Sequence, residues 1–283
     1  CEESTTGPGR EFGEGLAKNH GWVFEVPANA RGLVAPEPLY ALGRFNHEAA
    51  CVDPETGFVY MTEDRDDSVL YRFIPKQAGQ LAMGGRLQAM QVVDAPDLRN
   101  WSATSLRPSG VSAVNWLDLD DVESPEDDLR HRARAKGASL IARGEGIHMA
   151  QGEAYICSTS GGAARLGQIL RLHLSDTGEH DRLELFFESV STRQFNFGDN
   201  LTVAPNGHLV VCEDQYTEKV DNFLRGITPE GHAYPLARLR LQTELAGACF
   251  SPDGTTLFVN VYAPTKTLAI TGPWDRFINT VNA

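Results

Sequence analysis

Four stretches of the chain repeat one succession of hydrophobic and polar positions. Each contains an acidic residue, a short apolar run, a turn, and a second run in which Val, Tyr, Leu or Phe recurs. The turns contain Asp-Pro, Gln-Gly, Pro-Asn-Gly or Pro-Asp-Gly, where proline fixes φ and glycine or asparagine permits a positive φ. The pattern predicts four β-hairpins, within residues 47–64, 144–160, 199–215 and 244–262.

Further strand-like runs follow the hairpins at 68–75, 167–174 and 223–229, which suggests about four strands per unit. The acidic residues of the four hairpins lie 97, 54 and 45 residues apart. Because a propeller blade takes roughly 40–50 residues, the first interval has room for two units, and we expect a weak copy at 105–121. An all-β propeller is therefore the predicted fold.

One helix is expected to interrupt the strands. In the run SPEDDLRHRARAKGAS, Ser124 suits the N-cap, Pro125 the first turn and Gly137 the C-terminal end. We interpret the helix as a surface insertion between blades, with its charges facing solvent.

The opening residues Cys-Glu-Glu match the positions where the second strands of the hairpins end. This match predicts that the chain begins inside a blade. We therefore expect a six-bladed β-propeller with an incomplete first blade, formed by a single domain over 1–283 that is a fragment without the N-terminal region.

Composition and charge narrow the possible functions. The 283 residues are 41% hydrophobic and carry a net charge of −13, which disfavours nucleic acid as a partner. The apolar runs are only as long as strands, so no membrane span is expected. The five cysteines have long, irregular spacing, which fits neither a disulfide framework nor a CxxC metal site.

The repeated acidic residues are the strongest candidates for chemistry. The innermost strands of a propeller run along its central channel, so equivalent side chains would meet at the axis, and carboxylates that close need cations to stay ionised. Calcium prefers such oxygen donors. On position alone, each acid could instead be an ordinary residue at a strand start. The set comprises Glu48, Glu145, Asp199 and Glu244, with Asn200 and Glu213 as possible additions.

Arg143 precedes Glu145 by two residues, so in an extended strand both side chains would share one face. There it would either bind a phosphate or carboxylate, or form a structural ion pair. The other acids near the hairpins, and the histidines, are expected to be structural or exposed; these are Glu63, Asp64, Asp120, Glu123, His20, His47 and His148.

Several motifs resemble the PhoX-type alkaline phosphatases along nearly the whole chain. They are CEES from residue 1, NHGWVFEV from 19, ALGRFNHEAACVDPETGFVYMTEDRDDSVLYRFIP from 41, ARGEGIHMA from 142, DNLTVAPNGHLVVCED from 199, GACFSPDGTTLFVNVY from 247 and LAITGPW from 268. The resemblance implies a six-bladed propeller that hydrolyses phosphate monoesters with iron and calcium ions near the central channel.

Transferred to this sequence, the resemblance implies specific roles. Cys1 and Glu2 would be ligands of Fe³⁺, Arg143 would bind phosphate, and the remaining metal ligands would be Glu48, Glu145 and Asp199, with Glu213 and Glu244 added by strand position. It also implies small phosphorylated organic substrates, a monomer, and export to the periplasm or the outside of the cell. The export signal and a phosphate-binding lysine expected before the cysteine are not in this sequence, so activity of the fragment is in question.

Two other functions remain open. A calcium-dependent lactonase of the six-bladed type would need one cation site and would have no use for Cys1. A non-catalytic propeller would use axial calcium only to hold its blades together. The CEE and RGEG motifs favour the phosphatase, because a structural ion needs neither a thiolate nor an adjacent arginine.

Overall fold

The computed structural model describes residues 1–102, 104–175, 180–215 and 222–274, and nearly all of its regular structure is β-strand. The strands follow one another in four antiparallel meanders, which we call blades 1 to 4. Blade 1 comprises β1 (His47–Val52), β2 (Val59–Glu63), β3 (Tyr71–Pro75) and β4 (Gly85–Val92); blade 2 comprises β6 (Gly144–Ala150), β7 (Glu153–Ser158), β8 (Gln168–His173) and β9 (Arg182–Glu188). Blade 3 comprises β10 (Gly198–Val203), β11 (Leu209–Glu213), β12 (Asn222–Ile227) and β13 (Ala233–Leu239); blade 4 comprises β14 (Leu245–Phe250), β15 (Thr256–Val261) and β16 (Lys266–Thr271).

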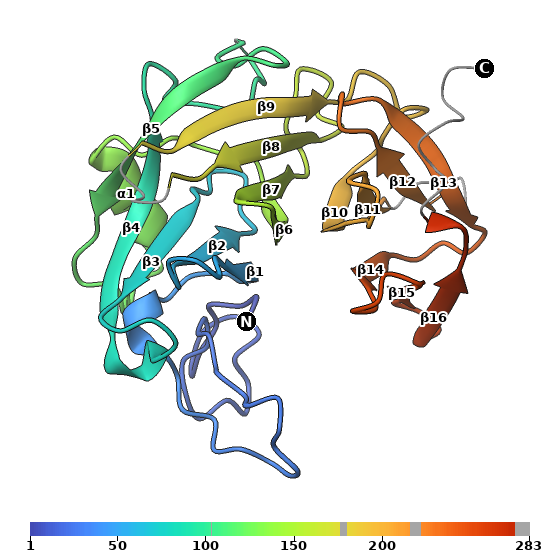
Figure 1. The fold of residues 1–283 in the computed structure, drawn as a ribbon. Coiled ribbons are helices and arrows are strands. Elements are labelled where there is room, and N and C mark those ends of the chain that lie inside the picture. The colour runs from blue at the N-terminus through green and yellow to red at the C-terminus, as the bar shows by residue number, and fades with distance from the viewer. Residues whose placement is uncertain (103, 176–179, 216–221, 275–283) are drawn as a thin grey trace.

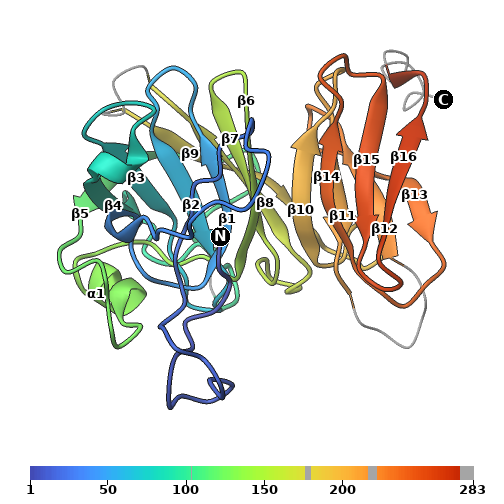
Figure 2. The same ribbon diagram turned by 90° about the horizontal axis from the view of Figure 1, so that it is seen from below.

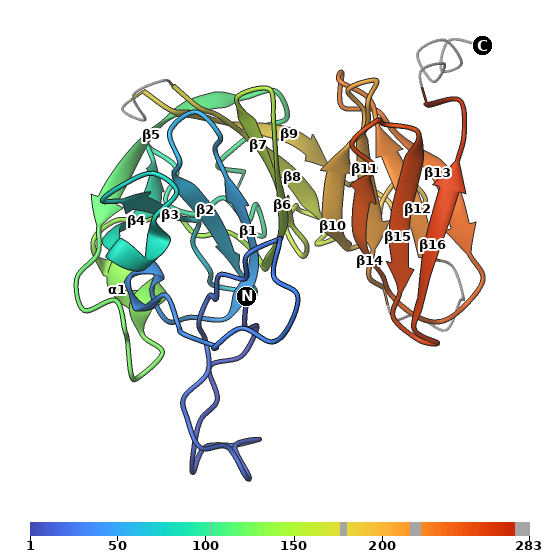
Figure 3. The ribbon, with the colours of Figure 1, turned by 60° about the horizontal axis from the view of Figure 1, so that its bottom comes forward.

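The blades lie side by side along an arc, with the first strand of each on the inner side (Figure 1). Contacts between β1 and β6, between β6 and β10, and between β10 and β14 hold neighbouring blades together at this inner side. Views from other directions show the same succession, with blades 3 and 4 stacked beside blades 1 and 2 (Figures 2 and 3). The predicted all-β propeller is confirmed, with four blades in the described residues. The opening residues 1–3, expected to end the second strand of an incomplete first blade, belong to no strand.

The weak copy expected at 105–121 is not a blade. This segment contributes one strand, β5 (Val111–Asp118), which pairs with β4 on one side and with β9 on the other. β5 thereby joins the outer edges of blades 1 and 2 into one nine-stranded sheet. The long first interval in the sequence is thus filled by this bridging strand and by a helical segment.

The four hairpin turns form as the sequence predicts. In the first, the Asp53 carboxylate accepts hydrogen bonds from the Glu55 amide (3.1 Å) and the Thr56 hydroxyl (2.6 Å). Gly57 and Gly207 have φ values of 73° and 83°, which an L side chain rarely adopts. These local interactions fix where each pair of inner strands reverses.

The inner second strands are buried on both faces. β2 and β11 are buried at every residue. Blades 2 and 4 cover the two faces of β11, whereas β2 is covered by blade 2 on one face and by the N-terminal segment and the helix α1 (Leu129–Ala135) on the other. Apolar side chains from adjacent blades form shared core clusters: Tyr60 and Ile156 belong to one, and Val210 and Val259 to another. Full burial of a side chain of this kind stabilises the fold by roughly 1.5–3 kcal/mol.

The helix exists but is shorter than predicted. α1 (Leu129–Ala135) begins after Asp128, and the Ser124 hydroxyl donates to the Asp128 carboxylate (2.7 Å) one turn earlier. It is not a purely solvated insertion, because Leu129 and Ala133 are buried in the core of blade 1. Two short 3₁₀ turns, η1 (Tyr40–Leu42) and η2 (Leu81–Met83), complete the regular elements of the described residues. None of the helices in that part of the chain is long and apolar enough to span a membrane.

Candidate active site

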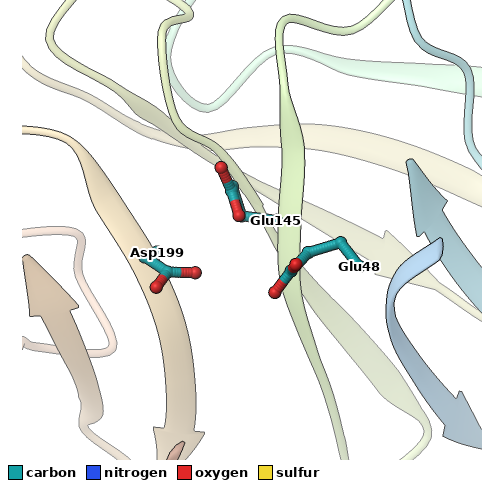
Figure 4. Close-up of side chains that lie close together, drawn as sticks. All are labelled: Glu48, Glu145 and Asp199. Carbon is teal, nitrogen blue, oxygen red and sulfur yellow. The ribbon is translucent and has the colours of Figure 1, made fainter. Parts of the chain in front are cut away.

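Three carboxylates from three blades meet at the inner side of the arc. Glu48 lies on β1, Glu145 on β6 and Asp199 on β10, and their oxygens lie within 4.8 Å of one another. Figure 4 shows the three side chains converging from separate strands. The sequence prediction that these residues would gather is borne out by their positions.

β-Bulges near the heads of the inner strands orient these three side chains. In each inner hairpin the strand register shifts by one residue near the head of the first strand, between His47 and Ala50, Gly144 and Ile147, and Gly198 and Leu201. The three acids lie within these shifted segments. Because a β-bulge bends its strand and redirects side chains, the bulges explain how the carboxylates reach one point.

Gly146 permits the close approach of blades 2 and 3. A Cβ atom at this position would lie 2.7 Å from Asn200 Cα and 2.8 Å from the Asp199 carbonyl oxygen. Main-chain atoms cannot move aside as a flexible side chain can. The glycine after Glu145 is therefore what allows Glu145 and Asp199 to lie together.

The three acids share an environment that disfavours their charged forms. Burial, reinforced by neighbouring carboxylates, raises the pKa of Glu48 to about 8 and that of Asp199 to about 8. The pKa of Glu145 is also raised, by burial first and then by Asp199. A cation among these oxygens would remove the repulsion, so the donor set suits a hard metal ion.

Arg143 lies directly beside this group. Its guanidinium donates to the Asp64 carboxylate from Nε (2.7 Å) and Nη2 (3.1 Å), and to Glu145 Oε1 from Nη2 (2.6 Å). The residue has a φ of 50°, so the extended backbone assumed from the sequence is wrong, yet the two side chains still meet. Asp64 was expected to be structural, but it holds the arginine at the site.

Of the two opening glutamates, Glu3 and not the predicted Glu2 lies against the carboxylate group. The Glu2 carboxylate accepts hydrogen bonds from the Gly21 and Trp22 amides and contacts His20 Nδ1 at 2.8 Å. Glu3, which the sequence did not single out, instead shares hydrogen bonds with Glu48 and Asp64, and burial raises its pKa. Only its position next to Glu2 could have signalled this.

Cys1 is exposed, and the group of three carboxylates does not include it. Its segment nevertheless runs beside the head of β1, since the His47 amide donates to the Glu2 carbonyl (3.2 Å). The buried Arg44 fixes the same segment, donating to the carbonyls of Thr5 (2.5 Å) and His20 (2.7 Å).

Glu213 lies apart from the three carboxylates. It is fully buried, accepts a hydrogen bond from Arg225 Nε (2.6 Å), and binds the amides of Asn196 and Phe223. Glu63 occupies the corresponding position at the end of β2 and pairs with Arg130 of α1 at 3.5 Å. Glu213 therefore forms an ion pair within its own blade, and Glu63 forms one with the helix α1.

Glu244 is near the site but out of register. The Glu244 carbonyl accepts a hydrogen bond from the Tyr262 amide, and the Arg143 carbonyl accepts the equivalent one from the Thr159 amide. Glu244 therefore corresponds to Arg143, which lies two positions before the acid of its blade. Its side chain still hydrogen-bonds to Asp199. Ala246 occupies the place that an acid fills in the other three blades.

A cleft of about 750 Å³ lies at the far ends of β1 and β6. Residues 52–55 and 149–153 line part of it, together with His173 and Arg182. None of the residues predicted for the site lines this cleft.

The chain is similar to one protein family and to solved structures of known proteins. Residues 3–265 match the family described as alkaline phosphatase PhoX. The structure of PhoX from Pseudomonas fluorescens in complex with vanadate, a transition state analogue, superimposes with a TM-score of 0.71 at 20% identity. The match covers 90% of this chain and 59% of that one, so the chain spans less than two thirds of the Pseudomonas protein.

A gluconolactonase from Xanthomonas campestris gives a much lower TM-score, 0.37, at 14% identity, covering 81% of this chain and 73% of that one. No curated protein sequence matches the chain. The family match extends over far more than half of the sequence and includes all three clustered carboxylates and Arg143. The chain belongs to the PhoX alkaline phosphatase family.

Proposed function

We propose that this chain carries the metal centre of a phosphate monoester hydrolase. The observation that supports it is the meeting of Glu48, Glu145 and Asp199 from three blades, with the Arg143 guanidinium hydrogen-bonded to one of them. Carboxylates that bind metal beside an arginine suit a substrate whose phosphate carries negative charge. The family match and the fold shared with the vanadate-bound Pseudomonas protein agree with this chemistry.

The donor set fits calcium. Three carboxylates, largely buried and mutually repelling, offer only hard oxygen ligands, and Glu3 and Glu244 stand beside them as further acids. When bound, the metal would neutralise phosphate oxygens and activate a water-derived nucleophile. The ligand roles of Cys1 and Glu2 toward Fe³⁺ remain predictions, since Cys1 is exposed and Glu2 is bonded to residues 20–22.

The chain's own residues would bind and orient the phosphate. Arg143 supplies a planar set of N–H donors for the equatorial oxygens, where charge must be stabilised in the transition state. The Asp64 carboxylate accepts hydrogen bonds from two nitrogens of Arg143 and so fixes the orientation of the guanidinium plane. Glu145 contacts the same guanidinium and belongs to the carboxylate group, which couples the position of the arginine to that of the metal ligands.

The wider setting follows from the same proposal. The substrates would be small phosphorylated organic molecules, and the protein would act as a monomer after export to the periplasm or the cell exterior. Its net charge of −13 is compatible with such a partner only where Arg143 and bound cations offset the acidic surface.

The test is hydrolysis of an aryl phosphate by the calcium- and iron-loaded protein, before and after complete removal of metal by a chelator. Phosphatase activity that disappears with the metal and returns with calcium and iron supports the proposal. Hydrolysis that survives complete metal removal would contradict the mechanism. A lactone assayed in parallel, and melting with and without calcium, identify a lactonase or a purely structural cation if no phosphate ester is cleaved.

A further inference from the structure

The loop between β4 and β5 reaches the face of the propeller on which the candidate site lies. Arg99 of this loop donates from Nη1 to the Asp66 carbonyl (3.2 Å), just beyond the Asp64 that holds Arg143. The Gly162 amide in the loop between β7 and β8 donates to the Arg99 carbonyl (2.8 Å). The loop is thus fixed between blades 1 and 2.

The indole ring of Trp101, in the same loop, forms cation–π contacts with two arginines. The guanidinium carbons of Arg99 and Arg165 each lie 4.4 Å from the centroid of the indole ring. At this distance the ring quadrupole attracts a cation. The tryptophan is itself fixed, because its Nε1 donates to the Ser160 carbonyl (2.7 Å).

This stack is connected to the candidate site through two adjacent residues. Thr159 donates from its amide to the Arg143 carbonyl (3.0 Å), and Ser160 accepts the hydrogen bond from Trp101. Since neighbouring Cα atoms are about 3.8 Å apart, the indole lies on the order of 10 Å from the Arg143 main chain.

The two stacked arginines differ in how their charge is balanced. Arg99 forms two hydrogen bonds with the Asp97 carboxylate, at 2.8 and 2.7 Å. Arg165 is exposed, and within the part of the chain that the structure describes no carboxylate lies at ion-pairing distance from it. An exposed guanidinium without an ion-pair partner in the described residues therefore stacks on the tryptophan that is connected through Ser160 to the segment beside Arg143.

We propose that Arg165, supported by Trp101, binds a second phosphate group of the substrate. The site would then prefer phosphate monoesters whose leaving group carries another phosphate across a spacer of about sugar size. This inference rests on the proposed function. Stacking on the indole leaves the edge of the guanidinium free to donate two parallel hydrogen bonds to phosphate oxygens, and it lowers the entropy that ordering the side chain would cost.

The test compares a hexose bisphosphate with the matching hexose monophosphate on the metal-loaded protein. We expect a higher kcat/KM for the bisphosphate, and we expect Arg165→Gln to reduce this preference about tenfold through KM, as the loss of a charge-assisted hydrogen bond implies. Trp101→Leu removes the indole ring on which Arg165 stacks, so it should also reduce the preference for the bisphosphate. Arg182→Gln, an exposed arginine in the cleft at the other end of the blades, should leave the preference unchanged.

An undiminished preference in Arg165→Gln would overturn the inference, whereas aryl phosphate hydrolysis by the parent reports separately on the proposed function. If the parent cleaves no phosphate ester, calorimetric binding of the bisphosphate still decides. Weaker binding by Arg165→Gln than by the parent and Arg182→Gln supports the subsite. Equal affinity in all three proteins rejects it.

Discussion

At the scale of single residues, the site depends on charges that are unfavourable without a partner. Glu48, Glu145 and Asp199 are held together although burial and mutual repulsion raise the pKa of each. Arg143 offsets part of this charge, but it is shared with Asp64. The remaining excess of acidic groups makes the cluster suited to a cation, which would supply the missing positive charge.

Glu145→Gln should therefore separate metal binding from folding. At a calcium concentration 100 times the parent's Kd, the parent should gain about 2.7 kcal/mol in its free energy of unfolding, and the variant less than half of that. Without calcium the variant should be at least as stable as the parent, because glutamine replaces a buried acid whose charged form its surroundings disfavour. Denaturant unfolding with and without calcium measures both effects. Glu230→Gln, in an exposed turn of blade 3, is the matched control, and an equal calcium gain in both variants would argue against the site.

Arg143→Lys tests the role of the planar guanidinium. Lysine keeps the charge but cannot bind Asp64 through two nitrogens while also contacting Glu145. We expect kcat for an aryl phosphate to fall about 100-fold, as for loss of a preorganised transition-state donor. Arg86→Lys, at an exposed ion pair with Asp118, should retain the parent's kcat. A variant as fast as the parent would mean that Arg143 is only structural.

At the scale of elements, the bulged inner strands decide which side chains face the axis. A regular strand would alternate strictly, whereas the register shifts at the heads of β1, β6 and β10 redirect the acids. Gly146 adds the second requirement, which is contact between the main chains of blades 2 and 3.

Gly146→Ala should push β10 away from β6 and separate Glu145 from Asp199. The added methyl group meets main-chain atoms at 2.7 and 2.8 Å, so we expect a loss of roughly 1–3 kcal/mol in stability and weaker calcium binding. Thermal melting and calcium titration measure the two effects. Gly32→Ala, where an added Cβ meets nothing within 4 Å, is the control. Unchanged calcium affinity in Gly146→Ala would show that this approach does not shape the site.

At the scale of the whole molecule, we expect the carboxylate group to couple the free energy of unfolding to pH and to calcium. Glu48 and Asp199 titrate near pH 8 in the folded protein, against ordinary values near 4, so the folded chain binds more protons than the unfolded chain between these limits. Their contribution to the stability of the metal-free protein is therefore complete below about pH 4 and is lost as the pH rises through about 8.

Calcium should compensate for that loss, because it competes with the bound protons. The increase in Tm on adding calcium should be larger at pH 9 than at pH 6, and melting curves in calcium and in chelator at both pH values measure it. Glu145→Gln should show a reduced increase at both values. A calcium effect that is equal or smaller at pH 9 would contradict this coupling.

The sequence by itself determined the hairpins, their turns and the identity of the three clustered acids. These features are local or repeated: Asp-Pro and Asn-Gly turns act within a few residues, and an acid at the head of each inner strand recurs in register in the first three blades. Only the tertiary structure decided the roles that depend on distant neighbours. β5 became a bridge because the edges of β4 and β9 were both free to pair with it.

Distant neighbours also distinguish the roles of acidic residues that occupy similar positions in the sequence. Glu213 is the last residue of an inner strand and Asp64 directly follows another. A buried Arg225 nevertheless neutralises Glu213, whereas Arg143 from another blade binds Asp64. Glu3 rather than Glu2 reaches Glu48 because the amides of residues 21 and 22 take the Glu2 carboxylate. The local sequence around a carboxylate does not reveal a hydrogen-bond or ion-pair partner that lies tens of residues away. In this chain such partners determine which carboxylates remain available to bind a metal or a substrate.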